Sequence, residues 1–165
     1  MTSSGTALVT LPTDEQILIT REFDAPKHLV YKAWTTPELV KRWWHAKRGE
    51  VTVVEIDLRV GGKWRYVMVA DDGFEVGFHG EYREIVRNER IVSTETYEGL
   101  PEGVSEEEGA TVNTATFAEA DGRTTLTLLV QAANKVSRDA IIDSGMEVGL
   151  QDALDLLEET AISLH

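Results

Sequence analysis

The sequence predicts an α+β fold, in which a curved antiparallel sheet of about six to seven strands is covered by one long C-terminal helix. Residues 135–164 repeat apolar side chains at steps of three and four, which is the helical period. Residues 51–131 alternate apolar and polar side chains in short runs that turn residues separate. Two short helical patterns follow the first strand. Together these observations indicate a sheet with one covered face.

Each element has its own local signal. A first strand is expected at residues 15–23, where Ile17 and Ile19 alternate with their neighbours. Pro26 opens a helix to about residue 34, because its missing N–H costs nothing at that position, and Pro37 opens a second, ending near residue 44. The later strands are expected at residues 51–58, 63–70, 74–86, 91–97, 113–120 and 124–131.

Large apolar side chains share one face of the central strands, because successive strand residues point to opposite faces. We expect this face to point toward the long helix and to line either a packed core or a cavity. Its members are Trp64, Tyr66, Met68, Phe74, Phe78 and Tyr82. The helix face expected to cover them includes Ile142, Met146, Leu150, Leu157 and Ala161.

The composition is that of one globular domain. The chain has 165 residues, of which 42% are hydrophobic and 27% charged, and this length can bury a sizeable core. Residues 1–13 contain Ser, Gly and Pro and are expected to form a flexible tail before a single domain at residues 14–165. No apolar run approaches the roughly 18 residues of a membrane helix, so no membrane span is expected.

Charge and cysteine content exclude several function classes. The formal net charge is −13 at pH 7, whereas nucleic-acid binding needs clustered Lys and Arg, so no nucleic acid is expected as a partner. We interpret the acidity as a solubility feature, with a basic partner or a salt-rich habitat as the alternative. The chain has no cysteine, which excludes disulfides and thiol chemistry and fits a reducing compartment; we expect a cytoplasmic location.

Five blocks of sequence carry a family resemblance. In chain order they are REFDAPKHLVYKAWTTPELVKRWW, VGGKWRYVM, Asp72-Gly73, GEYREIVRNERIV and SGMEVGLQDALDLL. Together they resemble the START-like, or SRPBCC, superfamily, and within it the bacterial branch related to the C-terminal domain of the activator of the ninety-kilodalton heat-shock-protein ATPase. The resemblance implies a helix-grip fold, a sheet wrapped around the C-terminal helix. The chain has Leu150 where family members often carry tryptophan.

The resemblance also implies a mostly apolar cavity between sheet and helix that holds a small hydrophobic molecule, lipid-like or aromatic. Superfamily members include lipid and sterol carriers, plant hormone-binding proteins and polyketide cyclases, so it does not name the ligand. The residues expected to bind the ligand are Trp34, Trp64, Tyr66, Met68, Phe74, Phe78, Tyr82, Tyr97, Phe117, Ile142, Met146 and Leu150.

An enzyme of the cyclase or dehydratase type is the second hypothesis. His79 and Glu81 form an exposed pair if Phe78 points inward, whereas the opposite register would bring them with Glu95 into a polar cluster able to transfer protons. Glu55, Asp57 and Glu95 are read as exposed strand residues, although a carboxyl inside an apolar cavity would have a raised pKa.

A protein-interaction module is the third hypothesis. Trp43 and Trp44 end the second short helix, where they either cap the barrel, one buried and one half-exposed, or form a gate or docking knob. A chaperone or other protein partner would then contact these residues or the acidic segment 102–108, and a homodimer also stays open.

No catalytic residue, metal ligand or cofactor site is assigned from the sequence. GxSxG, P-loop, GxGxxG and HExxH motifs are missing, and the histidines show no metal-binding spacing. Gly61-Gly62 precedes a strand rather than a helix, so it presents no helix N-terminus to a phosphate. Binding, rather than catalysis, is the leading expectation.

Overall fold

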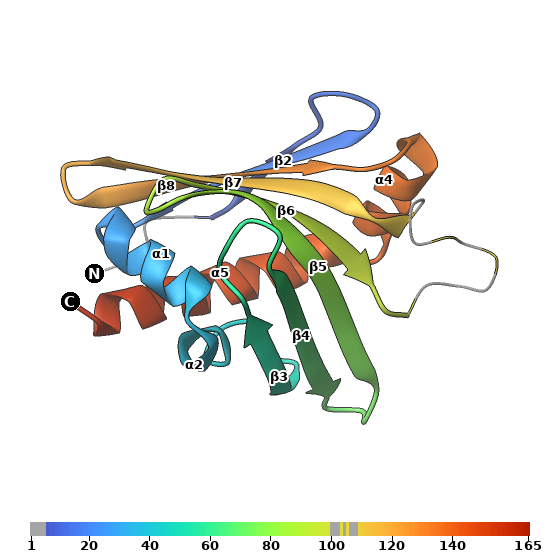
Figure 1. The fold of residues 1–165 in the computed structure, drawn as a ribbon, viewed down its shortest axis with the longest axis horizontal. Helices are drawn as coiled ribbons and strands as arrows, with labels where there is room; N and C mark the ends of the chain where they lie inside the picture. The colour runs from blue at the N-terminus through green and yellow to red at the C-terminus, as the bar shows by residue number, and fades with distance from the viewer. Residues whose placement is uncertain (1–5, 100–102, 104, 106–108) are drawn as a thin grey trace.

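One antiparallel sheet forms the body of the protein (Figure 1). The computed structural model describes residues 6–99, 103, 105 and 109–165. Within them the sheet has eight strands in the order β1-β2-β8-β7-β6-β5-β4-β3. The strands are β1 (Leu8–Thr10), β2 (Gln16–Phe23), β3 (Gly49–Ile56), β4 (Lys63–Ala70), β5 (Glu75–Val86), β6 (Arg90–Tyr97), β7 (Thr111–Ala120) and β8 (Arg123–Gln131). The helices are α1 (Lys27–Thr35), α2 (Pro37–Val40), α4 (Lys135–Asp143) and α5 (Met146–Ser163).

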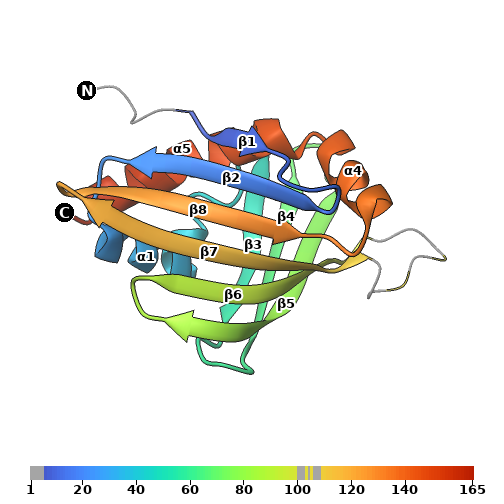
Figure 2. The same cartoon turned by 90° about the horizontal axis from the view of Figure 1, so that it is seen from above.

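The sheet bends strongly along its width. Seen from above, β3 and β4 cross beneath β7 and β8, α1 lies under these two strands, and α5 passes beneath β1 and β2 (Figure 2). Helices α1 and α5 pack against each other on this concave side. The predicted α+β class and helix-grip arrangement are therefore confirmed.

The closed core lies between the concave face and the second half of α5. Ile17, Ile19 and Phe23 of β2 point into it with at most 1% of their surface exposed, and Val30 of α1 and Leu157 of α5 are fully buried. The strand residues recur at period two on β2, which is why the sequence pattern located this strand well. Packing is thus closest where β2 and β8 meet α1 and α5.

The C-terminal helix is two helices, so the prediction of one continuous helix over residues 135–164 is wrong. Asn134 caps the first, since its side chain accepts a hydrogen bond from the Ser137 N–H at 2.8 Å. Gly145 has a φ of 82°, a left-handed conformation that glycine adopts without steric cost, and it separates α4 from α5. The apolar period continues across this break, so periodicity could not reveal it.

The N-terminal segment contains a strand where the sequence predicted only a flexible tail. Leu8, Val9 and Thr10 pair with β2 and add an edge strand to the sheet. Ala7 exchanges two hydrogen bonds with the Gln151 side chain of α5, at 2.9 and 2.8 Å. The tail prediction is therefore wrong for this part, while residues 1–5 lie outside the described residues.

Candidate functional site

Four aromatic side chains meet on the concave face; we call them the aromatic cluster. They are Trp44, Tyr66, Phe78 and Tyr97, and all four are half-buried. The Trp44 ring centroid lies 5.5 Å from that of Tyr66 and 5.9 Å from that of Phe78, both edge to face. The rings of Phe78 and Tyr97 lie 5.1 Å apart. Such geometries are favourable between aromatic rings.

Strand register brings the cluster together. Tyr66 of β4 is directly opposite Phe78 of β5, which is in turn opposite Tyr97 of β6. Residues opposite each other on one face of a sheet are in side-chain contact, so the three rings form a row across the sheet. Trp44 reaches this row from the turn that follows α2.

Trp64 supports the row from the buried side. Its ring centroid lies 4.9 Å from that of Tyr66, and its indole N–H donates to the Thr94 carbonyl oxygen at 3.1 Å. This hydrogen bond reaches across β5 at Gly80, where a Cβ atom would lie 2.6 Å from the indole nitrogen. Gly80 therefore allows the indole to lie close to the sheet, and it holds one side of the aromatic row in place.

Burial changes along α5 on the face that points to the sheet. Leu154 and Leu157 are at most 1% exposed, whereas Met146 and Leu150 on the same helical stripe are only half-buried. Strand β6 shows the same change on its inward face, from Ile91 at 3% exposed to half-buried residues near its end. The concave side is thus closely packed at one end and less completely covered near the first half of α5 and the end of β6.

A series of interacting polar side chains lies on β6 and β7 at this less covered end. The Thr111 hydroxyl donates to Asn113 Oδ1 at 2.8 Å, and the Asn113 side chain is hydrogen-bonded to the Glu95 carboxyl. Burial raises the pKa of Glu95, and the hydrogen bond from Asn113 opposes this in part. Burial also raises the pKa of Tyr66 well above its usual range, with smaller contributions from Tyr82 and then from Glu95.

Glu95 alone among the three strand carboxylates considered from the sequence lies in such surroundings. The side chains of Glu55 and Asp57 are exposed. Glu95 keeps part of its surface accessible, yet protein surrounds its carboxyl closely enough to desolvate it. Its interpretation as an exposed strand residue is therefore wrong.

His79 points away from this site. Its Nδ1 lies 2.9 Å from Glu98 Oε2, and Arg65 holds the same carboxylate through two hydrogen bonds of 2.9 Å. The expected exposed orientation of His79 is confirmed, but its expected partner is wrong, since Glu81 pairs with Lys63 at 3.2 Å. A proton-transfer cluster of His79 with Glu95 is thus not formed.

The other expected ligand-binding residues divide between closed core and exposed surface. Trp34 stacks on Trp43 with ring centroids 5.3 Å apart and meets Phe117 edge to face at 6.1 Å. Tyr82 is 6% exposed. Phe74 is 62% exposed and precedes β5, so its placement on the inward face is wrong.

The remaining expected residues are buried or half-buried. Met68 is buried on the same strand as Tyr66, and Ile142, Met146 and Leu150 of α4 and α5 pack partly buried against the core. Trp43 is buried and Trp44 half-buried, as the barrel-capping interpretation predicted.

Comparison with known proteins decides the family. The model of the family described as Activator of Hsp90 ATPase homolog 1-like protein matches residues 24–161. The chain belongs to this family. Its membership and its fold support a module that binds a ligand or a partner, without naming either one. No curated protein matches the chain.

Solved structures of bacterial proteins share this family's fold. A Rhodobacter sphaeroides protein has a TM-score of 0.87 at 22% identity, over 96% of this chain and 99% of that one. A Mycobacterium smegmatis protein has a TM-score of 0.82 at 23% identity, over 94% and 96%. A Chromobacterium violaceum protein has a TM-score of 0.77 at 27% identity, over 90% and 98%. The shared fold thus extends over 90–96% of this chain.

Sequence reasoning missed three residues of this candidate site. Trp44 was read as a cap or gate, although its ring completes the aromatic cluster. Thr111 and Asn113 were not considered. Period-two alternation could have found them, because they share the inward face of β7 with buried Ala115 and Phe117.

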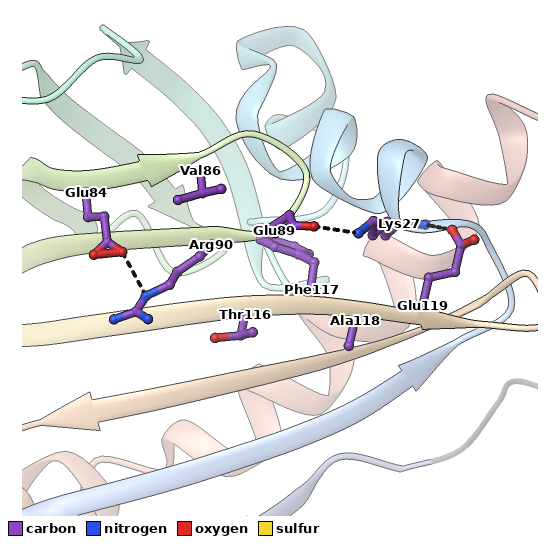
Figure 3. Close-up of a pocket in the computed structure, with 9 residues that line it drawn as sticks. All are labelled: Lys27, Glu84, Val86, Glu89, Arg90, Thr116, Phe117, Ala118 and Glu119. Carbon is purple, nitrogen blue, oxygen red and sulfur yellow. Dashed lines mark hydrogen bonds and ion pairs between the residues drawn. The ribbon is translucent and has the colours of Figure 1, made fainter.

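A separate depression of about 450 Å³ lies on the outer face, beside β5, β6, β7 and the start of α1 (Figure 3). Arg90 pairs with Glu84 at 3.0 Å, and the Lys27 ammonium pairs with Glu89 at 3.1 Å. The Lys27 backbone N–H donates to Glu119 at 2.8 Å. Because both cations are held by carboxylates, we assign no ligand to this depression.

Two further findings concern the described residues. Among them no group of three or more His, Cys, Asp or Glu side chains could hold a metal ion. None of their helices is long and apolar enough to cross a membrane.

Proposed function

We propose that this protein binds a small hydrophobic molecule, aromatic or lipid-like, between the aromatic cluster and helices α4 and α5. One observation carries the proposal. Inward-facing residues become less buried toward the start of α5 and toward the end of β6. Leu150 and Tyr97 are both half-buried there. Apolar side chains from helix and sheet are thus left incompletely covered on the two sides that face each other.

The energetics favour a bound apolar molecule. Each Å² of apolar surface removed from water contributes about 25 cal/mol, so covering the aromatic cluster is favourable. Ligand sites are commonly apolar clefts with a few convergent polar groups. Tyr66, Phe78 and Leu150 would supply the apolar lining, and Glu95 with Asn113 would supply the polar groups.

The unequal burial of the two helices supports a site that is open on one side only. The second half of α5 buries Ala153, Leu154, Leu157 and Ala161, whereas α4 buries only Arg138 among its residues. The break at Gly145 lets α4 take a direction of its own rather than continue along the sheet. A ligand could then be covered by α4 without disturbing the closed core.

The experiment is a titration with the neutral fluorophore N-phenyl-1-naphthylamine, which brightens in apolar surroundings. We expect a saturable increase with the unmodified protein and about tenfold weaker binding by Phe78→Ala, since the ring forms part of the contact surface. Phe74→Ala is the matched control, because Phe74 is the same residue type and is 62% exposed. Its affinity should equal that of the unmodified protein.

The opposite results would reject the proposal. A protein that leaves the fluorophore dim, or a Phe78→Ala variant that folds and binds as tightly as Phe74→Ala, contradicts a site at the aromatic cluster. Native mass spectrometry with organic extraction of the purified protein complements the titration, because a co-purifying molecule would give the ligand class directly.

A further inference from the structure

We propose that the natural ligand of this site is an organic cation, an apolar or aromatic body that carries an amine, and that Glu95 binds its charged nitrogen. The inference rests on the proposed function, since it names the ligand class of the same site. It combines the position of one carboxyl with the four rings beside it.

The position of Glu95 follows from sheet register. Glu95 lies opposite Thr111 in the ladder between β6 and β7, and Ser93 lies opposite Asn113. Ile91, four residues before Glu95 on β6, points inward at 3% exposure, so alternation directs Glu95 to the concave face as well. The carboxyl therefore faces the concave side of the sheet, on the strand that also carries Tyr97.

The hydrogen bonds around Glu95 hold it in a defined orientation. Thr111 donates its hydroxyl hydrogen to Asn113 Oδ1 at 2.8 Å, which leaves the Asn113 amide group to donate to Glu95. Because the Asn113 side-chain oxygen already accepts from Thr111, its NH₂ group is the part that can bond to Glu95, and it can only donate. It is therefore arranged to bind the ionised form of the Glu95 carboxyl.

Among the described residues, this carboxylate has Asn113 as a hydrogen-bond partner and no Lys, Arg or His nitrogen within 4.0 Å. Within the described residues, burial raises the pKa of Glu95 and the Asn113 hydrogen bond lowers it in part, and no Lys or Arg contributes. By contrast, the carboxylate of Glu98 has both Arg65 and His79. A desolvated carboxylate without a cation is unfavourable, and a bound ammonium group removes that cost.

The aromatic cluster fits the same chemistry. Aromatic faces attract cations, and rings grouped around a carboxylate are a known way to bind ammonium groups. Trp44 and Tyr66 lie edge to face, and Tyr97 follows Glu95 by two residues on β6, so the two side chains share one face of the sheet. An anionic ligand would be repelled by Glu95, and the net charge of −13 would also draw cations rather than anions toward the protein.

The test compares two probes of nearly equal shape by isothermal titration calorimetry at neutral pH: 1-naphthylmethylamine, which is cationic, and 1-naphthylmethanol, which is neutral. We expect the unmodified protein to bind the amine about tenfold more tightly than the alcohol. Glu95→Gln should lose most of this preference, because only the attraction of the rings and of the net charge then remains, with the affinity for the alcohol unchanged. Glu84→Gln is the matched control; its carboxylate pairs with Arg90 on the outer face, so the preference should remain.

The possible results separate this inference from the function on which it rests. Equal affinity of the unmodified protein for both probes, or tighter binding of the alcohol, overturns the cation assignment and leaves the hydrophobic site intact. A folded Glu95→Gln variant that keeps the preference overturns the role of Glu95. If neither these probes nor N-phenyl-1-naphthylamine bind, the proposed function itself is overturned. The comparison of probes on the unmodified protein does not depend on a variant that folds.

Discussion

The Arg21 guanidinium on β2 and the Glu158 carboxylate on α5 form an ion pair that is almost completely closed to solvent. Arg21 Nη2 lies 3.0 Å from Glu158 Oε1, and the two residues are 1% and 4% exposed. Arg21 Nη1 donates to Asp155 Oδ1 at 2.8 Å. The Asp24 N–H donates to Glu158 Oε2 at 2.8 Å. These contacts tie the second half of α5 to the sheet, opposite the less covered end.

Breaking this ion pair on one side should destabilise the fold strongly. Arg21→Met leaves Glu158 without its cation in a closed environment, and we expect a loss of about 3–5 kcal/mol in the free energy of unfolding. The double variant with Glu158→Leu should recover much of this loss, because neither charge then remains unpaired. Urea unfolding measures both.

An exposed pair provides the control. Arg123→Met removes an ion pair of 3.8 Å with Glu22 whose side chains are 43% and 59% exposed, so its cost should be about 0.5 kcal/mol or less. If the double variant Arg21→Met/Glu158→Leu is less stable than Arg21→Met alone, packing rather than charge determines the cost of the Arg21 substitution.

Gly80→Ala should destabilise the protein by about 1–3 kcal/mol, the usual cost of inserting a methyl group into closely packed surroundings. The new Cβ would lie 2.6 Å from Trp64 Nε1 and also against the Thr94 backbone oxygen, which cannot move away easily. Thermal unfolding gives the cost, and tryptophan fluorescence reports the displaced indole.

Gly77→Ala is the matched change in the same strand. A Cβ at Gly77 meets the end of the Glu98 side chain, which can shift, so the loss should be smaller than at Gly80. Equal losses at both glycines would contradict the special role of Gly80.

Acid should weaken the contact between Glu98 and Arg65. Hydrogen bonds from Arg65 chiefly, and from His79, lower the pKa of Glu98 from 4.5 to about 2. A carboxyl with a lowered folded-state pKa stabilises the fold above its unfolded value, and this contribution is lost as the pH falls from 4.5 toward 2. Because the pair is solvent-screened, we expect Glu98→Gln to cost only about 1 kcal/mol at pH 7 and less at pH 3.

Urea unfolding of Glu98→Gln and the unmodified protein at both pH values measures this difference. Glu81→Gln, which removes only one exposed pair with Lys63 at 3.2 Å, should have a smaller effect. If the cost of Glu98→Gln is the same at pH 7 and pH 3, the stabilisation does not come from the ionised carboxylate.

Leu150→Trp should fill the proposed site. Leu150 is half-buried on the stripe of α5 that faces the sheet, and a larger ring there would occupy the space assigned to the ligand. We expect N-phenyl-1-naphthylamine binding to weaken about tenfold or more, with little change in stability. A loss of about 1–3 kcal/mol in the free energy of unfolding would instead show that the space is already filled.

Leu154→Trp is the contrasting variant. Leu154 lies on the same stripe and is 1% exposed, so overpacking should destabilise this variant clearly. The pair of variants measures the difference between the closed and open ends of α5 without any knowledge of the natural ligand.

Local patterns predicted most of the fold but only part of the site. Tyr66, Phe78 and Tyr97 were placed among the site residues because alternation and the family resemblance both pointed to them, and they do form one cluster. Phe74 fits the same alternation in the sequence. It lies in the turn before β5, however, where side chains do not alternate between the two faces of a sheet. Periodicity cannot show where a strand begins.

The sequence alone determined the α+β class, the strands from β2 to β8 and the residues able to face the core, because chain geometry imposes periods of 2 and 3.6 on nearby residues. The five sequence blocks indicated the family. Tertiary structure alone decided which of these residues are covered. Leu150 and Leu154 share one stripe yet differ in burial, and Glu95 meets Asn113 from another strand. Coverage depends on what packs from distant parts of the chain, and no local pattern records that.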